Sequence, residues 1–251
     1  MNILLWSKSL ICLIVPFVST TALAVVNTRI TPTLPHITGL SGLPTPGSPL
    51  TAQLVTKHLE STPDLPLTGG ATELPATNLT ILVGVAIGRG IQNYTCATAD
   101  SVPVALGALA TLFDATALTY SNENLLHTLP GLIVYLPLPS SGVLAMAGSY
   151  LNILGHHYFD SAGTPTFNLS SVNKVGFVGK TASIDAPALA HKGPTGTGAV
   201  PWLQLNKKIG YTSIGFSQVY RVETAGGNPK LACTVAGVMS IPYGAEYWFY
   251  N

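Results

Sequence analysis

The stretch Leu-Thr-Ile-Leu-Val-Gly-Val-Ala-Ile, residues 79–87, has a large apolar side chain at every odd position. Thr80, Leu82, Gly84 and Ala86 lie between them. Neighbouring side chains of a β-strand point to opposite faces, so this period of two predicts a strand with its large residues on one face. We expect this strand to begin the folded domain.

Further apolar segments follow toward the C-terminus, with turn-forming residues at 160–163 and 225–229. We expect strands at residues 132–136, 150–159, 166–169, 175–178, 203–205, 211–223, 231–239 and 243–250. One short helix is predicted at residues 104–112, because apolar residues recur there at helical spacing and Pro103 suits a first-turn position. Short strands separated by turns predict an all-β domain, either a sandwich or a barrel of antiparallel strands.

Residues 1–24 have the pattern of a secretory signal peptide. Lys8 supplies the charge, residues 9–18 are largely apolar, and Ala22-Leu23-Ala24 is a small-residue cleavage pattern. The apolar run is shorter than the roughly 20 residues of a membrane helix. We therefore expect a secreted protein, extracellular or in the cell wall, whose mature chain begins near Val25 and has no membrane span. An uncleaved anchor is the alternative.

Residues 25–77 are rich in Pro, Thr and Gly, which interrupt long helices and central strands. Leu and Ile recur through this region. We therefore expect an extended arm that lies along the β-rich domain of residues 78–251, with at most a helical turn at residues 51–59. A disordered arm is the alternative.

The cysteines agree with export. Cys12 lies in the predicted signal peptide, which leaves Cys96 and Cys233 in the mature chain. Disulfides persist outside the cytosol, so we expect these two to be bridged, with a pair of buried free thiols as the alternative. Closing so long a loop gives roughly 5 kcal/mol of stabilisation in the chain-entropy model. Three sequons are candidate glycosylation sites, the second of which lies in a segment that looks packed: Asn78, Asn93 and Asn168.

Charged residues make up 8% of the chain, 11 basic and 10 acidic, whereas soluble domains typically have roughly 25%. A nearly neutral surface creates no field that attracts phosphates, so we expect no nucleic-acid partner. A carbohydrate or a small apolar ligand is compatible with this composition.

Motifs that identify common enzyme classes are missing from the sequence. It has no H-E-x-x-H or C-x-x-C metal pattern and no G-x-S-x-G elbow of a serine hydrolase. Gly84, Gly88 and Gly90 have the spacing G-x-x-x-G-x-G, which differs from the dinucleotide-binding fingerprint. We interpret these glycines as points of close backbone packing or a bulge, and expect no metal and no cofactor.

His156 and His157 stand out in the strand predicted at residues 150–159. As neighbours on a strand they point to opposite faces and cannot readily bind one metal together. His157 shares its face with apolar residues, which predicts a core histidine with a hydrogen-bond partner. His156 shares its face with polar residues and is the better candidate for acid–base or ligand chemistry, although a structural role explains it equally well.

The chain has few charged residues that could complete a catalytic site with His156. The further catalytic candidates are Asp160, Arg221 and Glu246. Some carboxyl groups could pair in space as glycosidase acids do: Asp114, Asp160, Glu223 and Glu246. The structural alternative for Arg221 is an ion pair with Glu223 or Glu246. Aromatic residues concentrate in residues 202–250. We expect most of them in the core, with an exposed sugar-stacking row as the alternative.

Six segments together resemble a family of secreted fungal proteins that share a domain of unknown function and are often labelled malate dehydrogenase. They are residues 88–96, 107–114, 155–159, 199–203, 219–227 and 238–250. The resemblance runs from about residue 79 to the C-terminus and implies no catalytic residues. The missing nicotinamide-binding fingerprint and the missing alternation of strands with helices argue against dehydrogenase activity.

Three functions remain open. The first is a non-catalytic binding or interaction role outside the cell or at its surface. The alternative is an enzyme that acts on a small apolar metabolite or a glycan in a barrel or cleft, with a structural wall component as a third reading.

We predict that protein collected from culture medium begins near Val25 and contains no free thiol, because Cys12 is removed and the other two cysteines are bridged. Peptide mass spectrometry after alkylation without reduction checks both points. Alkylated Cys96 and Cys233 in that material would contradict the second.

Overall fold

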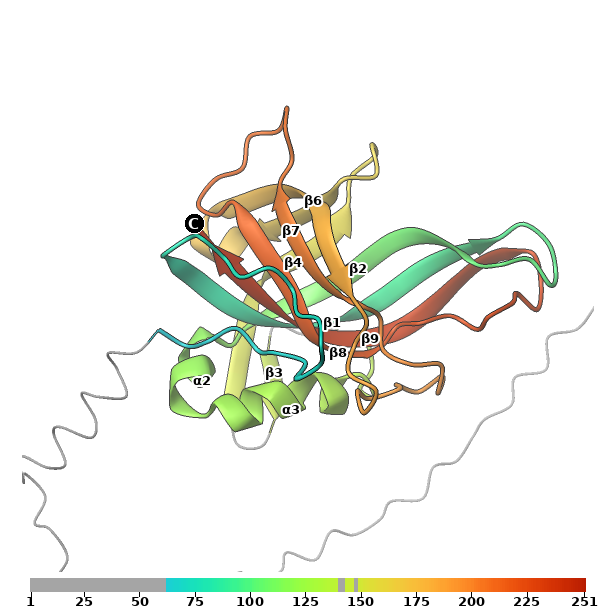
Figure 1. Cartoon of the computed structure of the whole chain (residues 1–251), viewed down its shortest axis with the longest axis horizontal. Helices are drawn as coiled ribbons and strands as arrows, with labels where there is room; N and C mark the ends of the chain where they lie inside the picture. Colours follow the sequence, from blue (N-terminus) through green and yellow to red (C-terminus); the bar gives the residue numbers. More distant parts are fainter. Residues whose placement is uncertain (1–61, 140–142, 147–148) are drawn as a thin grey trace, which may run out of the picture. The chain divides into compact units, whose positions relative to one another are not determined.

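Eight antiparallel strands close into a barrel (Figure 1). The computed structural model describes residues 62–139, 143–146 and 149–251. The described strands are β1 (Leu82–Cys96), β2 (Val104–Asp114), β3 (Val143–Met146), β4 (Ser149–Phe159), β5 (Pro165–Leu169), β6 (Lys174–Ile184), β7 (Trp202–Lys207), β8 (Gln218–Gly226) and β9 (Gly237–Tyr250). The helices are α2 (Thr116–Ser121), α3 (Glu123–Ile133) and the short 3-10 helix η1 (Ser170–Val172).

Each barrel strand pairs with a neighbour on both sides. The order around the barrel is β2-β1-β9-β8-β7-β6-β5-β4, and β4 pairs with β2 to close it. β3 pairs with β4 outside this ring, and α2 and α3 lie in the same connection between β2 and β4. Closure removes the open strand edges that would otherwise need another partner. The all-β expectation is confirmed, and the architecture is a barrel.

The strands carry two separate apolar clusters, one on each face. The first draws residues from all eight strands, as the inside of a barrel requires. Its large members include Phe167, Phe216, Tyr243, Tyr247 and Phe249. The second cluster lies on the outer face, where the helices and the segment before β1 cover it. It contains Leu74, Leu126, Leu129, Trp202 and Trp248.

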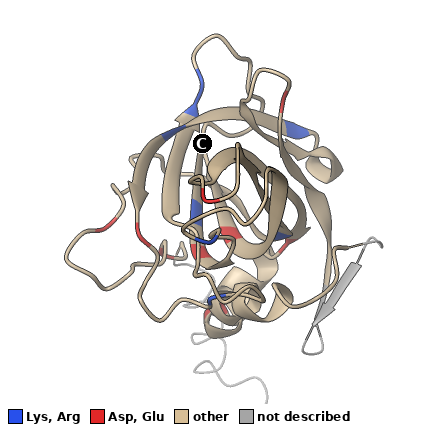
Figure 2. Ribbon diagram, turned by 90° about the vertical axis from the view of Figure 1, so that its right-hand side faces the viewer, with Lys and Arg blue, Asp and Glu red and all other residues tan. Residues whose placement is uncertain are grey.

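Charged residues are sparse on this frame. In Figure 2 the blue and red segments of the ribbon are few and scattered, with no continuous patch of one sign. Within the described residues, no helix is both long and apolar enough to cross a membrane.

The far ends of β1, β2 and β9 continue beyond the barrel as a three-stranded ribbon, seen on the right of Figure 1. The β1–β9 pairing runs from Leu82 opposite Tyr250 to Cys96 opposite Gly237. At its tip a disulfide joins Cys96 to Cys233, in the loop before β9, with 5.8 Å between the Cα atoms. The predicted disulfide is confirmed.

Several predicted elements are confirmed and others are wrong. The strands expected at residues 79–87, 150–159, 166–169, 175–178, 203–205 and 243–250 overlap or lie in β1, β4, β5, β6, β7 and β9. The strand expected at 211–223 begins only at Gln218. Residues 231–236 are loop rather than strand.

The helix predicted at residues 104–112 is wrong, because this segment is the strand β2. Residues four apart share a face on a strand as well as on a helix, so the spacing from 104 to 108 to 112 fits both. In β2 the alternate residues Ala108, Ala110 and Leu112 are buried in the barrel, and the strand pairs with both β1 and β4.

The strand predicted at residues 132–136 is also wrong, because Leu132 and Ile133 end the helix α3. The Asn122 side chain caps this helix by accepting a hydrogen bond from the Leu125 backbone N–H. Its buried residues Leu126, Leu129, Pro130 and Ile133 follow the spacing of a helical stripe against the barrel.

The segment before β1 runs over the outer face of the barrel. Residues 62–80 contain no helix or strand, and Leu65, Leu74 and Leu79 pack against the outer cluster. The Tyr220 hydroxyl and the Gln204 amide both donate to the Pro75 carbonyl, at 2.7 and 3.2 Å. The predicted signal peptide, most of the arm and the helical turn expected at 51–59 lie outside the described residues.

We predict that Gly88→Ala destabilises the protein by about 1–3 kcal/mol through overpacking. A Cβ atom at this inward position would lie 2.5 Å from Cε2 of Tyr247, which the packed barrel holds in place. The matched control is Gly179→Ala, because nothing lies within 4 Å of a Cβ atom there. Urea unfolding measures both, and equal stabilities of the two variants would contradict this packing.

Candidate functional site

The four catalytic candidates from the sequence do not form one site. His156 is exposed on β4. Asp160 lies in the turn after β4, where its Oδ1 accepts hydrogen bonds from the Ala162 and Thr164 backbone N–H groups at 2.9 and 2.7 Å. These contacts account for Asp160 as a turn residue.

Arg221 and Glu246 lie on opposite faces of the barrel wall. Arg221 borders a cavity inside the barrel, whereas Glu246 bonds to a helix on the outer face. The ion pair expected between Arg221 and Glu223 or Glu246 is therefore wrong, and in the described part of the chain the ion pairs within 4.0 Å involve only His127. His157 is a core residue as expected, with Nδ1 2.9 Å from the Thr166 carbonyl oxygen and its ring stacked on Phe167.

Glu246 is the centre of a polar cluster on the outer face. The residue is fully buried on β9. Its Oε1 lies 2.8 Å from Nδ1 of His127, and its Oε2 accepts a hydrogen bond from Trp248 Nε1 at 2.9 Å. Both oxygens of the buried carboxyl group therefore have partners, as such a group requires.

His127 comes from α3, at the edge of the stripe that packs on the barrel. The bond to Glu246 fixes the orientation of the ring and leaves Nε2 on the side away from the barrel, 3.6 Å from Oε1 of Glu123. Burial lowers the pKa of His127, but the hydrogen bond and charge of Glu246, with Glu223 and Glu123, outweigh it. The pKa therefore lies above its usual value.

Glu223 reaches the same region through a bulge in β8. Val222 pairs with Glu246 and Ala225 pairs with Gly244, so two residues of β8 lie opposite one residue of β9. Glu223 has a φ of 46°, in the left-handed region that favours glycine. A non-glycine residue held in this conformation is typical of functional sites. Burial, followed by the charge of Glu246, raises the pKa of Glu223 to about 7.

His127 and Glu223 both line a cleft of about 490 Å³ on the outer face. Its walls come from α3, from the loop between β6 and β7, and from the β8 bulge. The other lining residues are Thr128, Gly131, Leu132, Pro187, Leu189, Ala190, His191, Trp202, Thr224 and Ala225. Trp202 is buried, and its Nε1 has no hydrogen-bond partner among the described residues.

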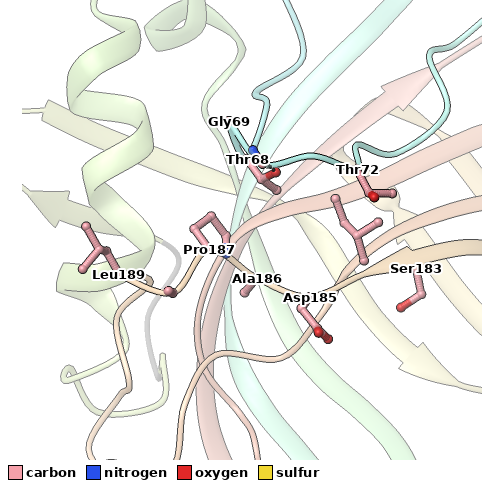
Figure 3. Close-up of a pocket in the computed structure, with 11 residues that line it drawn as sticks. Thr68, Gly69, Thr72, Ser183, Asp185, Ala186, Pro187 and Leu189 are labelled. Atoms are coloured by element: carbon pink, nitrogen blue, oxygen red, sulfur yellow. Dashed lines mark hydrogen bonds between the residues drawn. The ribbon is translucent and has the colours of Figure 1, made fainter.

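This cleft adjoins a larger hollow of about 690 Å³, with which it shares Pro187 and Leu189. Figure 3 shows its two sides, with Thr68, Gly69 and Thr72 of the arm facing the chain from Ser183 to Leu189. Asp185 is the titratable residue of this hollow. The combined groove has a neutral, hydroxyl-bearing and apolar part next to an acid–base part.

The cleft is lined by two titratable groups whose pKa values are raised. Glu223 titrates near pH 7 and His127 above the usual histidine value, so one can be a proton donor while the other is an acceptor. In the residues that the structure describes, no three His, Cys, Asp or Glu side chains are grouped to hold a metal ion.

Comparison with known protein families assigns the chain to one of them. Residues 75–251 match a family described as protein of unknown function, DUF3455. The chain belongs to this family. No curated protein and no solved structure matches it. Because the DUF3455 family is described without a function, its membership brings no mechanism to this protein.

Sequence reasoning missed His127 of this DUF3455 chain. Glu223 and Glu246 were among the carboxyl groups that could pair in space, and the charge of Glu246 contributes to the raised pKa of Glu223. His127 lies in a helix that was not predicted. The signals for that helix are Asn122 as a cap and the apolar stripe of Leu126, Leu129 and Ile133.

We predict that the free energy of unfolding falls as pH rises from 6.5 to 8. The folded state raises the pKa of Glu223 from 4.5 to about 7, so its stabilisation is lost between these values and the last part disappears above pH 6.5. The pKa of His127 is raised above 6.5, so its stabilisation is lost from pH 6.5 upward. Burial lowers the pKa of His157 from 6.5 to about 4, so this residue opposes the trend only while the unfolded chain still loses its proton, which ends just above pH 6.5. Urea unfolding at several pH values measures the slope.

Glu223→Gln should remove up to about 1 kcal/mol of the fall in unfolding free energy between pH 6.5 and 8. The value is small because solvent at the half-buried carboxyl group weakens the contribution of its pKa shift to stability. Asp185→Asn is the control, because Asp185 is exposed and lies in the other hollow. It should retain the pH dependence of the wild type. An unchanged slope in Glu223→Gln would show that Glu223 titrates as an ordinary carboxyl group.

Proposed function

We propose that this protein is a secreted enzyme that uses Glu223 and His127 as an acid–base pair on a neutral, hydroxyl-rich substrate, such as a glycan, in the outer cleft. One observation carries the proposal. Glu223, in a left-handed backbone conformation, lines the same cleft as a histidine that a fully buried carboxyl group orients. A histidine oriented by a buried carboxyl group is a recurrent arrangement for a general base.

The roles follow from accessibility. Glu246 is fully buried with both oxygens bonded, so it orients His127 and does not contact substrate. Of Glu223 and His127, one donates a proton to a leaving oxygen, while the other, in its deprotonated form, accepts one from a hydroxyl group, a water or a C–H bond; His127 acts through Nε2. The substrate gains one proton and loses one, as in hydrolysis, elimination or isomerisation.

The lining supports a neutral substrate. The groove beyond His127 contains Thr, Ser, Gly, Ala and Pro, and Asp185 is its one charged residue among those described. Trp202 contributes a buried indole to the cleft wall, and its Nε1 has no hydrogen-bond partner among the described residues. A carbohydrate, or a smaller molecule with several hydroxyl groups, matches this lining better than an anion or a nucleic acid does.

Secretion is part of the proposal. It is supported by the signal-peptide pattern in residues 1–24, the two exposed sequons Asn78 and Asn168, and the disulfide, which is weakly compatible with an extracellular location. A fungal source is likewise an inference from the resemblance. The dehydrogenase label that goes with this resemblance gains no support, because the strands form an antiparallel barrel rather than a doubly wound parallel sheet.

A non-catalytic binding protein is the second candidate. The observation in its favour is that the Glu246–His127 contact also fastens α3 to the barrel. In that case the polar cluster stabilises the cover of the barrel, and the groove binds its ligand without changing it.

The test incubates the secreted, disulfide-bonded protein with cell-wall polysaccharides, their oligosaccharide fragments and hydroxylated small molecules. Mass spectrometry detects products. We predict conversion of at least one compound, with a loss of at least about 100-fold in kcat for Glu223→Gln and for His127→Gln.

His156→Gln is the matched control, because this histidine is exposed on β4 and should leave the rate unchanged. Binding without any product, or full activity in Glu223→Gln, would reject the enzyme in favour of the binding protein.

A further inference from the structure

The inside of the barrel contains a small cavity that is separate from the outer cleft. Its volume is about 50 Å³. Its polar lining residues are Gln92, His157, Arg221 and Tyr247, and its apolar lining includes Phe167 and Leu205. The rest of the interior is filled by side chains, so this space is too small for a drug-sized ligand.

Arg221 brings a positive charge to this cavity, and no described residue neutralises it. The residue is only 9% exposed. Its Nη2 donates to the Pro201 carbonyl at 2.8 Å, whereas its Nε has no hydrogen-bond partner. In the part of the chain that the structure describes, no carboxyl group lies within 4.0 Å of the guanidinium nitrogens.

Arg89, which is also buried in the described part of the chain, has a complete set of hydrogen-bond acceptors. Arg89 is 5% exposed. Its Nε and Nη2 donate to the Leu136 carbonyl just beyond α3, and its Nη1 donates to the Gly90 carbonyl. Every nitrogen of Arg89 has an acceptor, whereas the Nε of Arg221 has none among the described residues.

The neighbours of Arg221 supply donors but no negative charge. Burial, with a smaller effect of Arg221, lowers the pKa of His157 to about 4, so this histidine is neutral at neutral pH. Burial raises the pKa values of Tyr243 and Tyr247, whose hydroxyl groups are 2.8 Å apart. Gln92 Nε2, on the cavity wall, has no partner among the described residues.

A guanidinium group stays protonated inside a protein, and a buried charge without a counter-charge is costly. One positive charge and two unpartnered N–H donors surround the same space. A single water could accept these hydrogen bonds but could not neutralise the charge. The cavity volume exceeds the roughly 10–15 Å³ that one water requires. The cavity is therefore large enough for one small monatomic ion.

We propose that the barrel interior binds one monovalent anion of the size of chloride, held by Arg221 and Gln92. The site stabilises the fold and is independent of the acid–base cleft, from which the barrel wall separates it.

The test follows thermal unfolding of the full secreted protein as sodium chloride replaces sodium gluconate at constant ionic strength. Gluconate is too large for the cavity. We expect a saturable rise in Tm with chloride, and the same with bromide. At a hundredfold excess of chloride over Kd, the unfolding equilibrium constant should fall by about 100-fold.

Arg221→Met should lose this response, whereas Lys207→Met, which removes an exposed cation from β7, should keep it. Should Arg221→Met not fold, two other experiments test anion binding in the barrel cavity. They are the chloride response of Gln92→Leu and anomalous scattering from bromide-soaked wild-type crystals. Equal Tm values in chloride and gluconate, or a cavity occupied by water alone in the bromide crystals, would overturn the proposal.

Discussion

The contact between Glu246 and His127 joins the barrel to its helical cover and makes the outer cleft possible. A carboxyl group with no exposed surface in the middle of β9 needs partners, and Trp248 of the same strand supplies only one. His127 supplies the other at 2.8 Å, which fixes one turn of α3 against the sheet. The cleft then forms between α3, the β8 bulge and the loop after β6.

The last strand, β9, has tyrosine side chains on its inner face and the carboxyl group of Glu246 on its outer face. β9 pairs along one edge with β1 and along the other with β8, so its faces are fixed. Tyr243 and Tyr247 point into the barrel, beside the region of Arg221, while Glu246 and Trp248 point outward. The positive charge of Arg221 therefore lies inside and the acidic groups outside, and neither can neutralise the other.

Much of the barrel could be predicted from the sequence, because alternation in single strands such as β1 is a local signal. The predicted export, which would leave only two cysteines, indicated the bridge. Barrel closure and the pairing partners depend on long-range register, which single segments do not encode. β2 was mistaken for a helix because its inward residues repeat every two positions and therefore also every four. The site required α3 for His127 and a bulge for Glu223, and the unusual His156-His157 pair drew attention to a strand that does not contribute to it.

The most direct measurement is the ¹H–¹⁵N long-range NMR spectrum of the histidine side chains as a function of pH. We expect His127 to retain a hydrogen-bonded proton on Nδ1 and to titrate above the usual histidine value, and Glu246→Gln to lower that midpoint. A His127 signal that titrates like a free imidazole, unchanged by Glu246→Gln, would contradict the contact on which the cleft depends.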